Sequence, residues 1–444
     1  MRSHLRQALD SLVASVGKPV RSRRSRRSHL FPSFLIALVV LAGWVLQSAA
    51  AQSQPRPFLI LISFDGWRWD YIDRADVPNL KALAKRGIRS QGLVPSFPSK
   101  TFPNHYTLVT GLYPDHHGII ANTMWDSIIG ERFTMSSDTA KDSRWWGGEP
   151  LWVTAIRQGR RASSMFWPGS EVAIGGVRPT AWKPFDDNYP NTDRVAQVLA
   201  WLALPEAERP SFITLYFSDV DTAGHTYGPD AWETLDAAEG LDERLGELVA
   251  GIDRLKLGDR TTIIATADHG MSQQALNRKI FIDDYVDQAT VDVIDWSPVL
   301  QIAPKNGSVD DLYRALHGKH PALSVYRKGE LPAALHYGTH PRIAPIVALA
   351  DDGWSITTHA RFESRKGERS LSGGEHGYDP RTRSMHALFV AAGPALRIGA
   401  TVPGFENIHV YEFMCRVLGL TPAKNDGSAG ATREFWRVTA GNDR

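Results

Sequence analysis

Short, continuous apolar runs alternate with amphipathic segments along most of the chain after residue 51. The apolar runs predict buried strands, because every side chain of a strand covered on both faces meets the core. These runs are Phe58–Phe64, Phe212–Phe217, Thr261–Ala267 and Ala387–Ala391. Apolar residues at helical spacing predict helices over Asn79–Arg86, Val195–Leu202 and Leu235–Leu255. The alternation indicates an α/β fold with a central, mostly parallel sheet and helices on both faces.

The pattern changes in the second half of the chain. Between residues 286 and 372, short alternating segments such as Val299–Ile302 and Ile346–Leu349 stand among loops rich in Gly, Pro and His. Alternation is typical of strands that have one face in the core and one in water. We therefore expect a small α+β subdomain at 286–372, inserted into a main α/β domain formed by 52–285 and 373–444.

The first 51 residues have the features of an export leader. A basic stretch, a 13-residue apolar core at Phe34–Leu46 and an Ala-x-Ala site ending at Ala51 predict a cleaved signal peptide. An uncleaved anchor is the alternative, but a bilayer span needs ~20 apolar residues, so we expect no stable membrane anchor after cleavage. The pair Arg26–Arg27 leaves both Sec and Tat export open. Cys415 is the only cysteine, which favours a secreted or periplasmic bacterial protein without disulfides.

The charge of the chain is concentrated in this leader. Residues 1–51 carry eight basic side chains and one acidic side chain, so the net charge of +2 for all 444 residues becomes −5 for the other 393. The pI of 8.5 therefore indicates no nucleic-acid-binding surface. A hydrophobic content of 43% with 22% charged residues excludes intrinsic disorder.

Aspartates end three of the predicted parallel strands, and histidines lie close to two of them. One such aspartate could simply cap a helix, but ligands bind beyond the carboxyl ends of strands in α/β sheets, where the three would meet. Oxygen and imidazole ligands without cysteine suit Zn²⁺, with Mn²⁺ or Fe²⁺ as alternatives. With a further histidine between glycines, the candidate ligands are too many for one tetrahedral ion and fit two. They are Asp65, Asp221, His225, Asp268, His269 and His376.

A candidate nucleophile lies in the segment Pro98–Tyr106. Pro103 favours the first turn of a helix, which would place the Thr101 hydroxyl at a helix N-terminus, where free N–H groups attract anions. A bound metal could activate such a hydroxyl without a neighbouring base. The alternative is that Thr101 is an ordinary N-cap residue.

Several motifs in order along the chain resemble those of the nucleotide pyrophosphatase/phosphodiesterase family in the alkaline phosphatase superfamily. The resemblance covers about residues 57–420 and gives an alkaline phosphatase-like fold as the expectation. Its motifs are Ser63–Arg68, Phe97–Tyr106, Thr110–Ile119, Asp221-x-x-x-His225, Thr266–Met271 and Gly374–Tyr378.

The resemblance implies a site with two Zn²⁺ ions. Asp221, His225 and His376 would hold one ion. Asp65, Asp268 and His269 would hold the other, and Thr101 would bridge the two as nucleophile. Asn122 matches a family asparagine that helps to bind a phosphoryl oxygen, although by itself it could be a turn residue. Hydrolysis would then proceed through a phospho-threonine intermediate.

The resemblance also suggests the substrate class, a nucleotide or another small phosphodiester. Phe102 and Phe185 match the walls of a nucleobase slot, although either could belong to the core. Lys100 could contact phosphate or be a solvated loop lysine, and Tyr216 could line the pocket. We expect release of nucleoside 5′-monophosphates. The alternatives are a lipid-headgroup (choline-type) phosphodiesterase or a phosphomonoesterase of the same superfamily, and a catalytically inactive binding protein.

Overall fold

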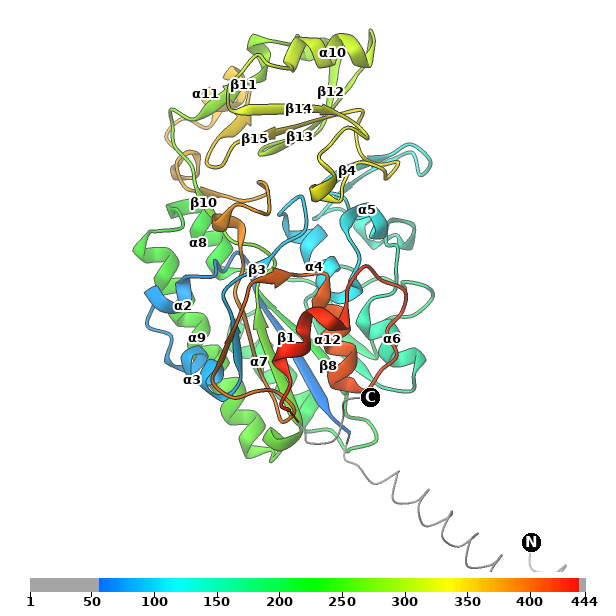
Figure 1. The fold of residues 1–444 in the computed structure, drawn as a ribbon, viewed down its shortest axis with the longest axis vertical. Coiled ribbons are helices and arrows are strands. Elements are labelled where there is room, and N and C mark those ends of the chain that lie inside the picture. The colour runs from blue at the N-terminus through cyan, green and yellow to red at the C-terminus, as the bar shows by residue number, and fades with distance from the viewer. Residues whose placement is uncertain (1–55, 439–444) are drawn as a thin grey trace, which may run out of the picture. The chain divides into compact units, whose positions relative to one another are not determined.

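The computed structural model describes residues 56–438, and its largest element is an eight-stranded sheet (Figure 1). The strands lie in the order β19-β2-β18-β9-β1-β8-β6-β7. In that order their bounds are Ala400–Val402, Ile88–Ser90, Phe389–Ala392, Thr261–Thr266, Phe58–Phe64, Phe212–Phe217, Ala162–Met165 and Ala181–Lys183. All four apolar runs predicted as strands thus belong to one sheet.

The direction of the strands is mostly as predicted. From β9 through β1, β8 and β6 to β7, every neighbouring pair is parallel. By contrast, β18 is antiparallel to both of its neighbours, β9 and β2, so the sheet is mixed. All side chains of β1 are buried, as expected for a central strand that is covered on both faces.

Helices cover both faces of this sheet, which confirms the predicted α/β architecture (Figure 1). One group packs around the long helix α9. This group consists of α2 (Tyr71–Arg74), α3 (Pro78–Arg86), α7 (Asn191–Leu202), α8 (Asp219–Tyr227) and α9 (Trp232–Arg254). The other face carries α4 (Thr101–Thr110), α6 (Leu151–Arg157) and α12 (His409–Leu418). Cys415 is buried in α12, in agreement with its apolar surroundings in the sequence.

A second, smaller sheet lies beyond the end of the large one, in the upper part of Figure 1. It is antiparallel, with the order β12-β13-β15-β14, and α10 (Val309–Leu316) packs on it. The strand bounds are Val291–Asp295, Val299–Pro304, Ile346–Ala350 and Leu323–Arg327. A separate hydrophobic cluster fills this part and extends from Ile280 to Met385. The insertion limits 286 and 372 therefore stay a prediction.

Shorter helices and two-stranded sheets complete the described part of the chain. They are α5 (Pro114–His117), α11 (His359–Ser364), β3 (Leu93–Val94), β4 (Thr123–Asp126), β5 (Glu131–Thr134), β10 (Ser272–Gln273), β11 (Lys279–Phe281), β16 (Ser355–Thr357), β17 (Gly374–Glu375) and β20 (Phe405–Glu406). The predicted signal peptide at 1–51 lies outside the described residues. Among residues 56–438, no helix combines the length and the apolar character that a membrane crossing requires.

Candidate metal and phosphate site

Three aspartates lie at one edge of the large sheet because they follow three adjacent parallel strands. Asp65 comes directly after β1, and Asp268 comes shortly after β9. Asp221 lies in the first turn of α8, which begins just after β8. His225 is one helical turn beyond Asp221, and His269 is next to Asp268. Register and helical periodicity thus bring together residues that are up to about 200 positions apart in the sequence.

A first group of ligands forms around Asp221. Its Oδ2 lies 3.4 Å from Nε2 of His225, and its Oδ1 lies 3.7 Å from Nε2 of His376. His376 comes from the loop after β17 and is buried. The loop approaches α8 so closely that a Cβ on Gly373 would lie 2.0 Å from the carbonyl oxygen of His225. Glycine is therefore required there for His376 to reach this group.

A second group forms around His269. Its Nε2 lies 2.9 Å from Oδ2 of Asp268 and 3.5 Å from Oδ1 of Asp65. The same nitrogen lies 3.3 Å from Oγ1 of Thr101. The predicted nucleophile thus touches the second group.

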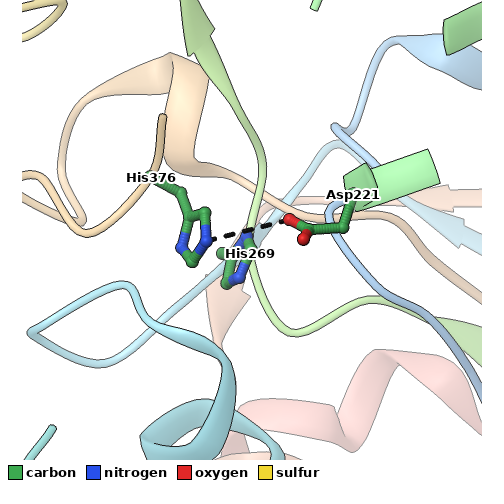
Figure 2. Close-up of side chains that lie close together, drawn as sticks. All are labelled: Asp221, His269 and His376. Atoms are coloured by element: carbon green, nitrogen blue, oxygen red, sulfur yellow. Dashed lines mark ion pairs between the residues drawn. The ribbon is translucent and has the colours of Figure 1, made fainter. Parts of the chain in front are cut away.

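The two groups adjoin each other. Figure 2 shows His376 and Asp221 facing each other beside His269, and potential ligand atoms of these three residues lie within 4.8 Å of one another. The rings of His269 and His376 stack with their centroids 3.5 Å apart. All six predicted ligands therefore meet in one place, and their division between two ions stays a prediction.

Three carboxylate oxygens in the site are buried without a hydrogen-bond partner in the part of the chain that the structure describes. They are Oδ1 of Asp65, Oδ1 of Asp221 and Oδ2 of Asp268. An uncompensated buried carboxylate is costly, and proteins pair such groups or use them to coordinate metals. A divalent cation would satisfy all three oxygens, so the residues present fit a metal centre.

The histidine rings are also oriented to bind a metal through Nε2. Nδ1 of His225 lies 3.0 Å from the carbonyl of Gly374, and Nδ1 of His376 lies 2.8 Å from that of Ser99. Nδ1 of His269 contacts the carbonyl of Gly270 at 2.9 Å. A carbonyl can only accept, so each Nδ1 carries the proton and donates. Each Nε2 therefore directs its lone pair toward the aspartates, as in metal-ligating histidines.

The titration of the aspartates reflects the crowding of negative charge. Burial, followed by the nearby Asp268 and Asp221 carboxylates, raises the pKa of Asp65 well above its usual value. Burial acts in the same direction on Asp268, but His269 and His105 outweigh it and hold the pKa of Asp268 well below its usual value. The site thus carries more carboxylate charge than its side chains neutralise.

Thr101 lies in the first turn of α4, as predicted, but it is not the N-cap. The N-cap is Lys100, and no side chain of the cap accepts a hydrogen bond from the helix. The loop before Thr101 is held by Asn104, whose Nδ2 donates to the carbonyls of Pro98 and Lys100 at 2.9 Å each. In this turn the N–H of Asn104 donates to the Lys100 carbonyl, and Pro103 has no N–H. The N–H of Thr101 and the positive end of the helix remain to favour a phosphoryl group near the hydroxyl.

Asn122 lies beside the same helix end, just before β4. Its Oδ1 accepts from the backbone N–H of Phe102 at 2.9 Å. This bond fixes the orientation of the side chain, which leaves the Nδ2 amide free to donate to a phosphoryl oxygen. The structure thus brings Asn122 to Thr101, and its role in binding phosphate stays a prediction.

The predicted nucleobase walls differ in how far they are buried. Phe102 is half-buried and packs edge-on against Phe133, with ring centroids 5.9 Å apart. Phe185 is 53% exposed, so the alternative that it is a core residue is wrong. Its ring packs edge-on against that of Tyr216, with the ring centroids 6.1 Å apart. The Tyr216 hydroxyl donates to Oδ2 of Asp65 at 2.7 Å. Tyr216 therefore links the exposed aromatic ring to the metal centre.

Residues 59–379 match the family model described as type I phosphodiesterase / nucleotide pyrophosphatase. The chain belongs to this family. The human ectonucleotide pyrophosphatase/phosphodiesterase family member 5 is 35% identical over 406 residues, which are 91% of this chain and 82% of that protein. Venom phosphodiesterase CdcPDE of Crotalus durissus collilineatus is 39% identical over 384 residues and 84% of this chain. The chain spans 46% of the length of this venom protein.

A solved structure of the family is similar over its whole length. Murine ectonucleotide pyrophosphatase/phosphodiesterase 5, an inactive threonine-to-alanine variant in complex with AMP, has a TM-score of 0.81 and 36% identity. It covers 86% of this chain and 100% of its own chain. The similarity confirms the alkaline phosphatase-like α/β fold. The relatives are named phosphodiesterases and nucleotide pyrophosphatases, which are hydrolases.

The sequence interpretation missed His105, although it stands in the Pro98–Tyr106 motif of the family. Its Nδ1 lies 2.9 Å from the Thr101 carbonyl and 3.3 Å from Oδ2 of Asp268. Its Nε2 lies 2.8 Å from Oγ of Ser63. The i, i+4 spacing from Thr101 on a helix was the signal that could have placed His105 beneath the site. It ties the helix that carries Thr101 to Asp268.

The Lys100 side chain is buried, and its ammonium group is paired with a carboxylate. It is 6% exposed, and its Nζ donates to Oδ2 of Asp295 at 2.6 Å. The alternative of a solvated loop lysine is therefore wrong, because β12 of the small sheet covers the side chain. Burial raises the pKa of Asp295, while Lys100 opposes this shift. A contact between Lys100 and phosphate stays a prediction.

Proposed function

We propose that this protein is a zinc-dependent nucleotide pyrophosphatase/phosphodiesterase that releases nucleoside 5′-monophosphates through a phospho-threonine intermediate. One observation carries the proposal. Three buried aspartate oxygens have no hydrogen-bond partner among residues 56–438 and lie beside three imidazoles whose Nε2 atoms are free to bind a metal. The Thr101 hydroxyl lies 3.3 Å from Nε2 of one of these imidazoles, that of His269. Family membership and the AMP complex of the murine relative support the same activity.

The residues divide into two ligand sets. Asp221, His225 and His376 would hold one Zn²⁺, and the second set, Asp65, Asp268 and His269, would hold the other. The mixture of imidazole and carboxylate suits Zn²⁺ better than Mg²⁺, which prefers oxygen ligands. When bound, the ions supply Lewis acidity that lowers the pKa of a hydroxyl and stabilises charge on phosphoryl oxygens.

The chain itself supplies the nucleophile and its positioning. Thr101 attacks phosphorus as the leaving group departs, and water then hydrolyses the phospho-threonine from the opposite side. The amide of Asn122 and the backbone N–H of Thr101 hold the non-bridging oxygens. Inactivation of the murine relative by a threonine-to-alanine change supports a threonine in this role. Phe102 and Phe185 bind the base by stacking, which contributes ~1–3 kcal/mol with little base selectivity.

The variant Thr101→Ala tests the mechanism. We expect kcat to fall about 10³-fold or more, because the covalent route is lost. The Zn²⁺ content should stay at the wild-type level, and Thr101→Ser, which keeps a hydroxyl, should retain part of the activity. Phosphothreonine at position 101, trapped by acid quench and identified by mass spectrometry, is expected in the wild type. Substantial activity of metal-replete Thr101→Ala would overturn the nucleophile, and full activity after chelation would overturn the metal centre.

A panel of substrates tests the specificity. It consists of p-nitrophenyl phosphate, p-nitrophenyl thymidine 5′-monophosphate, ATP and a choline phosphodiester. We expect the two nucleotide substrates to have the highest kcat/KM. Preference for the monoester or the choline diester would replace the nucleotide assignment by one of the alternatives.

A further inference from the structure

A cavity of about 330 Å³ adjoins the first ligand group: His225 lines it, whereas Thr101 and its partner His269 do not. His225 and Glu375 line it next to the site, and Lys279, Trp296 and Arg361 line it farther along. We name it the cationic cavity. Its lining residues come from α8 and β17, from α11, β11 and β16, and from loops.

Arg361 carries a positive charge that faces the cationic cavity without a counter-ion. Its guanidinium lies over the ring of Trp296 at 4.3 Å from the centroid, which holds the side chain in place. The structure pairs it with no carboxylate among residues 56–438. Burial and the positive charge of Arg365 lower the pKa of Arg361, and no acidic neighbour opposes the shift.

Lys279 adds a second positive charge, with no carboxylate in hydrogen-bond contact. Burial lowers its pKa to about 8, and the Glu375 carboxylate opposes this shift. The lysine is 8% exposed, and its Nζ donates to Oε1 of Gln274 at 2.7 Å, to Oγ of Ser355 at 3.0 Å and to the Leu371 carbonyl at 2.7 Å. All three acceptors are neutral. Since buried ammonium groups are normally paired with carboxylates, this arrangement leaves a positive field for a ligand.

The other charges of the lining do not cancel this field. Arg365 is compensated, because its Nε donates to Glu368 at 2.8 Å. Glu375 is the single carboxylate among the lining residues. It accepts from the backbone N–H of His376 at 3.1 Å and from Nε2 of Gln274 at 3.2 Å. These donors are neutral, so Glu375 keeps its charge and offsets one positive charge of the lining. Lys279 and Arg361 together still leave one positive charge in excess.

The position of the cationic cavity suits the departing part of a substrate. Thr101 contacts the second ligand group, whereas His225 of the first group opens into the cavity. In phosphoryl transfer the attacking and leaving oxygens lie on opposite sides of phosphorus. Attack from the Thr101 side therefore directs the leaving oxygen toward His225 and any further phosphates into the cavity.

We propose that the cationic cavity binds the pyrophosphate or polyphosphate leaving group of the substrate, with Arg361 as its main contact and Lys279 as a supporting charge. The inference rests on the proposed function and adds a leaving-group subsite to it. Nucleoside triphosphates and other substrates with an anionic leaving group are favoured over diesters that release an uncharged or singly charged alcohol.

The variant Arg361→Gln tests the proposal, because it removes the charge of an exposed side chain and keeps a polar, unbranched one. ATP and p-nitrophenyl thymidine 5′-monophosphate are compared with the zinc-loaded, full-length protein. We expect the ratio of kcat/KM for ATP to that for the nitrophenyl ester to fall about tenfold, since hydrogen bonds to charged groups are strong. Inhibition by inorganic pyrophosphate should weaken by a similar factor, and Arg361→Lys should restore part of both.

The matched control is Arg327→Gln, an arginine of the small sheet that pairs with Asp310 and Glu330 and does not line the cationic cavity. It should leave the ratio and the pyrophosphate inhibition unchanged. An equal loss on both substrates in Arg361→Gln, or unchanged inhibition by pyrophosphate, overturns the inference and leaves the proposed function intact. If the wild type hydrolyses neither substrate, the proposed function itself fails.

Discussion

Two clusters of buried charge in this protein are built in opposite ways. In the first, Arg342 of the small-sheet region is 9% exposed and inserts into the main domain. It donates to Oδ2 of Asp126 at 2.6 Å, to the carbonyls of Gly118 and Trp145 at 2.7 Å each, and to that of Arg144 at 2.9 Å. Its guanidinium also lies over the Trp145 ring at 4.7 Å. All of its nitrogens have partners.

The second cluster, at the edge of the large sheet, leaves part of its negative charge uncompensated. Asp65, Asp221 and Asp268 each have one buried oxygen without a hydrogen-bond partner, and no lysine or arginine of residues 56–438 forms an ion pair with them. The contrast distinguishes two uses of buried charge. A fully paired charge joins parts of a fold, whereas an unpaired one indicates that a ligand supplies the opposite charge.

The largest effect is expected on the paired cluster. Replacement of Arg342 by methionine leaves the buried Asp126 carboxylate without its charged partner. It also removes hydrogen bonds to three backbone carbonyls. Breaking a buried pair by removing one partner costs about 3–5 kcal/mol. We expect the free energy of unfolding of Arg342→Met, measured by urea denaturation, to fall by this amount, while the bound Zn²⁺ per folded molecule stays at the wild-type value.

An exposed arginine of the same region provides the control. Arg327 pairs with Asp310 and Glu330 at the surface, where ion pairs contribute little. Arg327→Met should therefore change the denaturation midpoint only slightly. The double variant of Arg342→Met with Asp126→Asn should lose less stability than the two single variants added together. Equal losses of unfolding free energy in Arg342→Met and Arg327→Met would show that the buried, fully paired arginine stabilises the fold no more than an exposed one.

A change in the unpaired cluster should have the opposite sign. Asp65→Asn removes one of the crowded carboxylates and keeps an oxygen that can accept from Tyr216. We expect the metal-free protein to gain about 1 kcal/mol of unfolding free energy, as is common when a functional site is relieved of strain. The wild type should gain about 2.7 kcal/mol when free Zn²⁺ is 100 times its Kd, and the variant much less.

The measurement is thermal unfolding after chelation and after Zn²⁺ addition, with Asp310→Asn as the control at an exposed carboxylate. The control should show the full zinc response of the wild type. Loss of stability in metal-free Asp65→Asn would mean that the aspartate is structurally compensated, which is the property that separates the two clusters.

The sequence was sufficient for the unpaired cluster and not for the paired one, for a physical reason. Ligands at strand ends follow from local patterns, because parallel register alone brings Asp65, Asp221 and Asp268 together. The direction of β18 could not be predicted, since an apolar run has no polarity. Contacts between the small sheet and the main domain were equally hidden: Lys100, at the start of α4, meets Asp295 of β12 across 195 positions, and neither residue carries a local signal of the other.

The smallest effect concerns aromatic rings instead of charges. It tests whether a ring without full packing partners also indicates a ligand site. Phe133 is buried against Phe102 and Trp145, whereas Phe185 presents 53% of its surface to solvent with only edge contacts to Phe166 and Tyr216. An exposed aromatic ring beside a polar site is available for stacking on a base. We therefore expect Phe185→Ala to weaken AMP binding by about 1 kcal/mol, roughly fivefold in Kd, at the lower end for one stacked base.

Stability separates this role from a packing role. Phe185→Ala should leave the melting temperature unchanged, because the ring fills no core volume, whereas Phe133→Ala should lower the unfolding free energy by about 3–5 kcal/mol. Titration of zinc-loaded protein with AMP and with inorganic phosphate completes the test. Only AMP binding should respond to Phe185→Ala, since phosphate has no base to stack. Equal weakening of both ligands would show that the ring supports the metal centre through Tyr216 instead of binding the base.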